Sequence, residues 1–96
     1  MLIADKVYIS DNLHDYQDIE VPIKSQAVVF KKSVCIGNYS WLGENVCVIG
    51  ASVGKHSVVG ANSVVTSDIP DYSIAVGTPA KVIKQYNHQM NQWERV

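Results

Sequence analysis

Aliphatic residues recur at about every sixth position along the middle of this sequence, between residues 36 and 66. Glycine directly follows the aliphatic residue in four of these units, at Gly37, Gly43, Gly54 and Gly60. The fifth position of the six-residue units is small or β-branched, and it holds Ser40, Val46, Ser57 and Ser63. Only the third unit is short, with five residues. A period of six matches neither an amphipathic helix nor an alternating strand, but it is typical of hexapeptide β-helix repeats.

Each unit is expected to form one short strand and one tight corner of a three-sided prism. The opening aliphatic side chain points into the prism, and the residue at the fifth position must be small enough to lie beside it. Glycine after the aliphatic residue lets the backbone turn without a steric cost. One coil cannot bury its own apolar interior, whereas stacked coils can. The sequence therefore predicts an all-β chain wound as a single-stranded parallel β-helix.

Length and charge narrow the classes of protein to consider. The 96 residues suffice for one domain, and the net charge of −1 argues against broad binding to nucleic-acid phosphates. No stretch reaches the roughly 18–20 apolar residues of a membrane span, and Asp5 and Lys6 come too early for a secretory signal. We therefore expect a cytoplasmic protein without nucleic-acid or membrane partners. Cys35 and Cys47 stand two hexads apart, hence on different faces, and are expected to stay reduced.

Ile3 and Ile9 are six residues apart and already open units of the repeat, so we expect the chain to start inside the β-helix. An open coil exposes apolar interior and backbone donors, which favours self-association. Residues 11–22 are polar and acidic, lack a period, and are expected to form a loop that projects from the prism. Phe30 stands six positions before Ile36 and is interpreted as part of a resumed coil, with Lys31 and the residue after it at a solvated corner.

The end of the chain departs from the repeat. Residues 67–71 carry a turn signal, and residues 72–76 are expected to form another strand. Tyr86, Met90 and Trp93 follow at roughly helical spacing. They predict a short amphipathic helix, with a frayed tail as the alternative. We therefore divide the chain into a β-helix over residues 1–84, with its loop at about 11–22, and a helical tail over residues 85–96.

Three boxes carry a resemblance to a known family. They are "WLG" at residues 41–43, "GANSVVTSDIP" at residues 60–70 and "VGTPAKVI" at residues 76–83. With the hexads, they make the chain resemble the hexapeptide-repeat acyltransferases, and most of all the O-acetyltransferases of galactosides, maltose and capsular polysaccharides. The resemblance implies a left-handed β-helix of about four coils. It also implies acetyl-CoA as co-substrate, a saccharide-like acceptor and a homotrimer with active sites between the prisms.

The loop carries the segment Asp11-Asn12-Leu13-His14. In the family this place holds a motif of the form Asp-His-x-His or Asp-Asn-x-His. The resemblance therefore implies that His14 is the general base of a direct acetyl transfer, and that Asn12 lies at the acceptor, although it departs from the two-histidine form. An imidazole can accept a hydroxyl proton at neutral pH. The backbone N–H of Glu44 matches the family's oxyanion donor, whereas Trp41 either lines the acceptor pocket or packs at a subunit contact.

The coenzyme site is likewise implied by the resemblance. Ala61 would let pantetheine lie close to the backbone, and Lys84 would reach the nucleotide phosphates. A threonine–lysine pair contacts the coenzyme in the family. This chain has Thr66 followed by Ser67, so we expect weaker binding of CoA, with Lys81 as a possible substitute.

Two other functions come from different classes. Family members usually carry several coils before this point, so the chain could be a truncated, inactive β-helix that serves as a binding or assembly module. Some hexapeptide-repeat proteins are zinc enzymes with three histidine ligands. His56 and His88 lack the spacing that this chemistry would need, and we expect no metal. Titration with CoA separates the transferase from the module.

Overall fold

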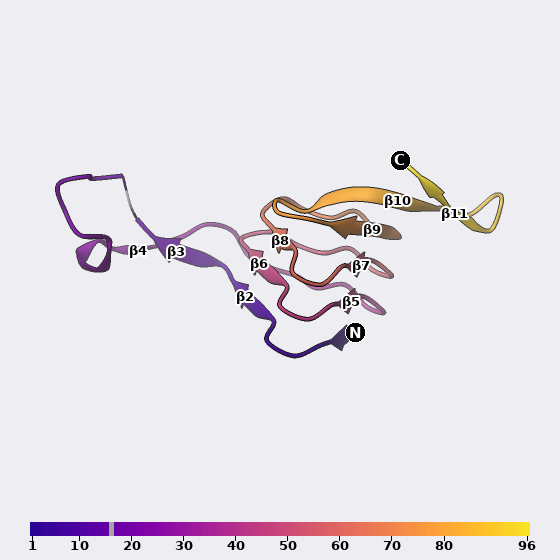
Figure 1. Cartoon of the computed structure of the whole chain (residues 1–96), viewed down its shortest axis with the longest axis horizontal. Helices are drawn as coiled ribbons and strands as arrows, with labels where there is room; N and C mark the ends of the chain where they lie inside the picture. Colours follow the sequence, from indigo (N-terminus) through magenta and orange to yellow (C-terminus); the bar gives the residue numbers. More distant parts are fainter. Residues whose placement is uncertain (16) are drawn as a thin grey trace.

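The computed structural model describes residues 1–15 and 17–96. It is an elongated all-β molecule that measures 55 × 24 × 21 Å (Figure 1). Its only helical segment among the described residues is one 3₁₀ turn, η1 (Ile23–Ser25). No helix in this part of the chain is long and apolar enough to cross a membrane.

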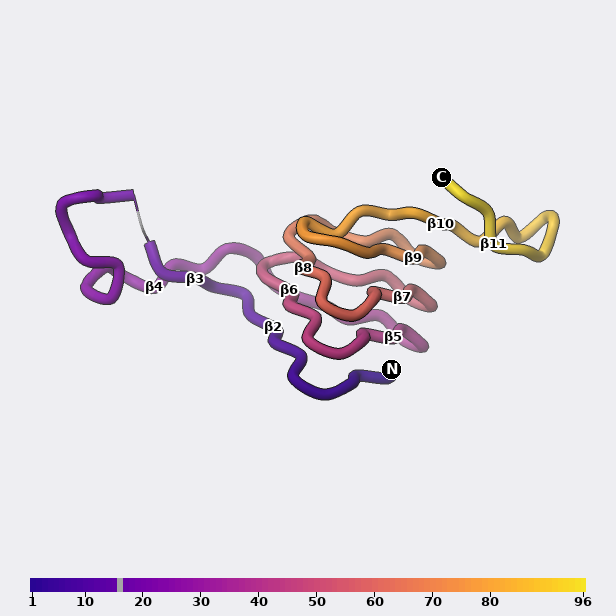
Figure 2. Tube along the Cα trace, viewed as in Figure 1, coloured from indigo at the N-terminus to yellow at the C-terminus, as the bar shows by residue number. Residues whose placement is uncertain are grey.

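Short parallel strands stack on three faces. The first, which we call the groove face, contains β1 (Leu2–Ile3), β5 (Trp41–Leu42), β7 (Val58–Val59) and β9 (Ser73–Val76). The second contains β2 (Tyr8–Ser10), β6 (Cys47–Ile49) and β8 (Val64–Val65). Single bridges join Ile36 to Val53 and Val53 to Ile69 on the third. Figure 2 shows the chain winding through these faces in turn.

The register of the strands reproduces the repeat of the sequence. Trp41 pairs with Val58, and Cys47 pairs with Val64, in both cases 17 residues along the chain. Three hexads would take 18 residues, and the short third unit removes one. The predicted parallel β-helix is therefore confirmed, including the pairing of Ile3 with Leu42 in the next coil. The first and last coils are partial, and the expected number of about four coils stays a prediction.

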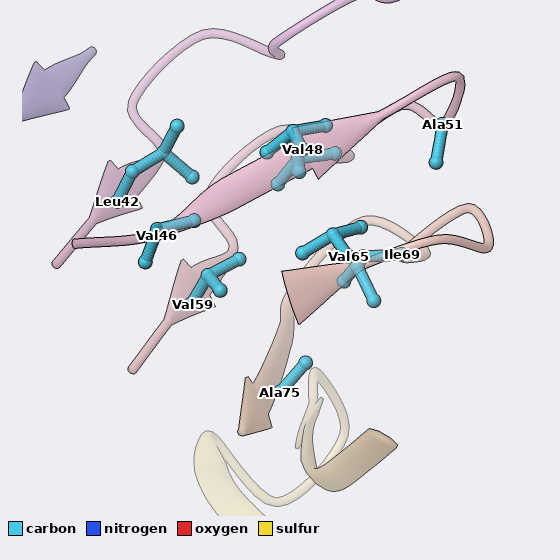
Figure 3. Packing of buried hydrophobic residues seen from close by; sticks show 9 residues of the cluster. Leu42, Val46, Val48, Ala51, Val59, Val65, Ile69 and Ala75 are labelled. Atoms are coloured by element: carbon cyan, nitrogen blue, oxygen red, sulfur yellow. The ribbon is translucent and has the colours of Figure 1, made fainter. Parts of the chain in front are cut away.

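The interior is narrow and filled by the opening aliphatic residues. Leu42, Val48, Val59 and Val65 are fully buried, and Figure 3 shows their side chains gathered inside the coils. Serines at the fifth position are buried beside them and link successive coils. The Ser40 hydroxyl donates to the Gly54 carbonyl at 2.6 Å. The small fifth position thus supplies hydrogen bonds as well as space.

The glycines of the repeat serve a purpose other than the one we expected. The left-handed backbone conformation falls two residues later, for example at Tyr39 (φ 62°), Asn45 (φ 60°) and His56 (φ 53°). Gly43 is needed because a Cβ there would lie 2.8 Å from the backbone nitrogen of Ala61 in the next coil. These glycines permit close stacking of coils, and the prediction that they make the turn is wrong.

The excursion from the prism is longer than the expected loop at 11–22. Strand β3 (Asn12–His14) pairs antiparallel with β4 (Val28–Phe30), with Asn12 opposite Phe30. Residues 11–15 and 17–33 form an excursion, here called the arm, that projects from the coils in Figure 1. The prediction that Phe30 belongs to a resumed coil is wrong, because strand β4 finds its backbone partners on β3 and not in a stacked coil. The coil resumes at Ile36.

The C-terminal segment is a β-hairpin, so the predicted helix over residues 85–96 is wrong. Strand β10 (Lys81–Asn87) pairs antiparallel with β9, and β11 (Gln92–Arg95) pairs with β10. The aromatic residues that suggested a helix are cross-strand neighbours, with Tyr86 opposite Trp93. Strand β10 also pairs with the last exposed edge of the groove face, which a helix could not do. Cys35 and Cys47 are both free thiols, as expected.

Candidate active site

A groove of about 400 Å³ runs along the groove face. It is lined by Ala4, Trp41, Gly43, Glu44, Val58, Val59, Gly60 and Ala61. These residues come from the first three coils, and the walls are outward positions of strands β5 and β7. Gly43 and Gly60 carry no side chain, so the floor between the walls is backbone. An extended ligand can therefore approach the main chain closely along the direction of coil stacking.

The indole of Trp41 forms one wall and is 49% exposed. Strand register places Trp41 beside Val58, Val58 beside Ile74, and Ile74 beside Lys84. These residues therefore form one column on the groove face. Lys84 lies three strand spacings from Trp41, or about 14 Å.

A second cation lies beside Lys84. Arg95 is its cross-strand partner in the hairpin, and both residues line a hollow of about 250 Å³. The structure thus puts two positive charges at one end of the column that begins at Trp41. Sequence reasoning selected Lys84 but missed Arg95, because the pairing depends on a hairpin that was expected to be a helix.

Glu44 and Ala61 occupy equivalent corners of successive coils. The Glu44 carbonyl accepts a hydrogen bond from the Asn62 N–H at 2.8 Å, which fixes the corner. The Glu44 N–H donates to no acceptor among the described residues, and the Glu44 side chain is exposed. An unpaired N–H at the mouth of a groove is a suitable donor for an oxyanion.

Thr66 and Ser67 lie outside the groove, on the segment that follows β8. The end of the arm that returns to the coils contacts this segment through Lys31 and Lys32. The Lys31 ammonium donates to the Thr66 carbonyl at 3.4 Å, and Lys32 forms an ion pair with Asp68 at 2.9 Å. The hydrogen bond from Lys32 lowers the pKa of Asp68, with help from the Ser52 N–H. Asp68 balances the charge of Lys32, so Lys31 is the cation that brings net positive charge to the segment of Thr66 and Ser67.

His14 lies on strand β3 of the arm and is exposed. Its Nδ1 lies 3.3 Å from the Gln26 carbonyl, which can only accept. When Nδ1 donates this proton, Nε2 of the neutral ring keeps a free lone pair. The side-chain amide of Asn12, on the same strand, donates to Asp11 at 2.8 Å. The arm thus presents His14 as a potential base, with Asn12 two residues away.

The structure joins only some of the expected site residues. Trp41, Glu44 and Ala61 line one groove, and Lys84 shares their face. His14 and Asn12 lie on the arm, which projects at the opposite end of the coils from β5 and β7 (Figure 1). Within one chain they are therefore far from the groove. In the described part of the chain, no group of three or more His, Cys, Asp or Glu side chains gathers that could hold a metal ion.

Comparisons with known proteins point to one family. No known family profile matches the chain. The putative lipopolysaccharide biosynthesis O-acetyl transferase WbbJ of Escherichia coli K12 is 43% identical over 101 residues, which cover 98% of this chain and 52% of that protein. A maltose O-acetyltransferase from Clostridium difficile 630 is 34% identical, with a TM-score of 0.75 over 90% of this chain and 45% of that one.

A galactoside acetyltransferase in complex with coenzyme A is 31% identical, with a TM-score of 0.71 over 91% of this chain and 46% of that one. The solved neighbours are left-handed β-helix acetyltransferases. The chain spans about half the length of these relatives. Given the stacked hexads, the groove face and these similarities, the chain belongs to the hexapeptide-repeat acyltransferases.

Proposed function

We propose that the chain transfers an acetyl group from acetyl-CoA directly to a hydroxyl of a saccharide-like acceptor. The observation that carries the proposal is the groove. It combines a backbone floor, an unpaired N–H at Glu44 and a pair of cations further along the same face. In a thioester with a phosphorylated tail, the extended arm needs the backbone floor, the carbonyl oxygen needs the N–H, and the phosphates need the cations. The names of the relatives, which include maltose and galactoside acetyltransferases, support the choice of acceptor.

In this proposal the pantetheine arm of acetyl-CoA lies in the groove. Its thioester would be at the Trp41 end, and Ala61 would allow close contact with the backbone. The nucleotide phosphates would reach Lys84 and Arg95, about 14 Å away by strand spacing. Roles for Thr66 and Ser67 at the coenzyme remain part of the proposal. The nearby ammonium group of Lys31, which contacts carbonyl groups and no carboxylate among the described residues, would supply the charge that Ser67 lacks.

The chemistry needs a base and an oxyanion donor. His14 Nε2 would take the proton of the acceptor hydroxyl as its oxygen attacks the thioester carbonyl carbon. The Glu44 N–H would stabilise the oxyanion of the tetrahedral intermediate. When the intermediate collapses, the C–S bond breaks and the CoA thiolate takes the proton from His14. Asn12 would hold the acceptor beside this base.

A homotrimer would bring the base to the groove. Because the arm points away from its own groove, His14 can serve only the groove of a neighbouring subunit. The arm also carries exposed apolar side chains, including Ile19 at 93% exposure and Phe30. An isolated two-stranded ribbon with such a surface is poorly stable on its own. A neighbouring prism would cover it, which supports the trimer. A cytoplasmic location likewise stays a prediction.

Complementation between two inactive variants tests the site. His14→Ala should lower turnover by about 10²–10⁴-fold with the fold intact. Ala61→Trp should fill the groove and abolish CoA binding. Mixed trimers of the two variants should regain roughly a quarter of the sites by random assembly, because an intact arm then meets an intact groove. Full activity of His14→Ala would remove this residue from the mechanism, and no regain on mixing would exclude a site between subunits.

An inactive binding or assembly module is the second candidate, because within one chain the arm that carries His14 lies on the other side of the coils from the groove (Figure 1). Calorimetric titration with CoA separates the two functions. Binding that Ala61→Trp removes supports the transferase. Absence of binding at millimolar CoA would favour the module.

A further inference from the structure

Aromatic side chains form a column at one corner of the prism. Tyr39, His56 and Tyr72 occupy the same corner of successive coils, each in the left-handed conformation. The rings of Tyr39 and His56 are stacked at 5.2 Å, and those of His56 and Tyr72 at 5.5 Å. The corner that holds Lys6, Asn45 and Asn62 has the same backbone conformation, which asparagine and histidine adopt more easily than tyrosine. The backbone conformation therefore does not explain why Tyr39 and Tyr72 stand here.

The C-terminal hairpin closes the upper end of this column. His88 meets Tyr72 edge to face at 4.5 Å, and Tyr86 meets Trp93 at 5.4 Å with planes 73° apart. Between them lies a hollow of about 410 Å³. All its lining residues carry rings, and they are His56, Tyr72, Tyr86, His88 and Trp93. We call this hollow with its column the aromatic corner.

The aromatic corner directly borders the groove. Tyr39 stands two residues before Trp41, and His56 stands two residues before Val58. Tyr39 and His56 lie in the turns that lead into β5 and β7, and one buried serine separates each of them from the groove residue that follows. Two residues of backbone span at most about 7 Å. A ligand that reaches across the edge of the groove face would therefore meet the column within the length of one or two sugar rings.

The core does not require these rings. Tyr39 is 74% exposed, His56, His88 and Trp93 are exposed, and the buried cluster contains none of them. Aromatic surface left in solvent next to a binding groove is typical of a ligand contact.

The chemistry of the lining selects among ligands. No carboxylate lines the hollow, and the Lys55 ammonium already lies 5.8 Å from the centre of the Tyr72 ring. A cationic ligand is therefore disfavoured. Ring faces carry negative π density that attracts weakly positive C–H groups, while phenol, indole and imidazole groups offer hydrogen-bonding atoms at the edges. A pyranose presents both, with an apolar C–H face and a rim of hydroxyls.

We propose that the aromatic corner binds a second sugar unit of the acceptor, outside the unit that is acetylated. The preferred acceptor is then an oligosaccharide or glycan chain and not a single sugar. This inference rests on the proposed function for the identity of the acceptor, but binding at the corner needs neither acetyl-CoA nor His14.

The test measures binding of sugars of increasing length to the full chain without acetyl-CoA. The probes are glucose with its α-1,4 oligomers, and N-acetylglucosamine with its β-1,4 oligomers, up to six units. Tryptophan fluorescence and NMR shifts of the aromatic rings report occupancy. At least one series should bind about 10-fold or more tightly as it lengthens beyond one unit, which corresponds to about 1.4 kcal/mol.

Two variants locate the effect. His56→Asn keeps a residue suited to the left-handed corner, and Trp93→Ala removes the opposite wall. Each should abolish the gain with length. Met90→Ala, exposed in the same hairpin but outside the lining, should retain it.

Two results would overturn the inference. One is a failure of every sugar to bind more tightly with length. The other is an unchanged gain in both variants. Loss of CoA binding or of turnover with intact sugar binding would instead count against the proposed acetyl transfer alone.

Discussion

Removing one buried hydroxyl, in Ser57→Ala, tests how the coils are held together. Ser57 is fully buried, and its hydroxyl donates to the Pro70 carbonyl at 2.7 Å. The same oxygen accepts from the Ser73 N–H at 3.2 Å in the next coil. Alanine would leave both partners without this hydrogen bond in the interior. Each such loss costs about 1–3 kcal/mol, so we expect the two losses to lower the free energy of unfolding by about 2–6 kcal/mol.

Such a loss is large for a domain of this size, whose total stability is about 5–15 kcal/mol. Such a loss corresponds to a fall in Tm of at least about 8 °C, because 1 kcal/mol shifts Tm by about 4–8 °C in a domain of 60–100 residues. Calorimetry and urea unfolding of the full chain measure it.

Alanine variants of two other serines show whether the loss of stability follows the number of buried hydrogen bonds. The Ser63 hydroxyl accepts only from the Gly77 N–H at 2.9 Å, so Ser63→Ala should cost about half as much. Ser33 is exposed and makes no side-chain hydrogen bond to a described residue, so Ser33→Ala should stay within about 0.5 kcal/mol. Equal stabilities of the Ser57→Ala and Ser33→Ala variants would refute a role of buried serines in linking coils.

Three further predictions concern stacking, charge and the coenzyme. Gly43→Ala should lower the free energy of unfolding by about 1–3 kcal/mol, and by more than Gly60→Ala does. The reason is that an added Cβ would meet backbone atoms at residue 43 but chiefly the Val76 side chain at residue 60. Equal Tm values of the two variants would argue against the backbone contact. The pKa of Asp68 is lowered in the folded state, so its stabilising contribution is present above 3.8 and lost as the pH falls through the folded value. Asp68→Asn should therefore flatten the acid limb of the stability profile, and an unchanged limb would contradict this. Lys84→Ala should weaken CoA binding about 10-fold but leave acetyl-pantetheine unaffected, as titration with both ligands would show.

The winding of the chain could be predicted because its signal is local and periodic. Opening residues such as Leu42 and Val59 must all be buried, and only a β-helix buries residues at every sixth position. The boundaries of the arm were less accessible. Phe30 fits the spacing of a hexad, but β4 pairs with β3. The periodicity of the sequence cannot show whether a segment pairs with a stacked coil or with another strand of the arm. The same holds for the hairpin at Tyr86 and Trp93, whose spacing also fits a helix.

The sequence alone determined the prism and its inward residues, because both follow from position within the repeat, whereas Trp41, Glu44 and Ala61 were selected through the resemblance to the acyltransferase family. Tertiary structure decided what meets across coils and across the hairpin. It placed Arg95 beside Lys84, fastened Lys31 to the Thr66 carbonyl, and gathered Tyr72, Trp93 and their neighbours at one corner. These contacts join residues that are not related by the six-residue repeat. The contacts of the hairpin also depend on the edge of β9, which is still unpaired where the repeat ends.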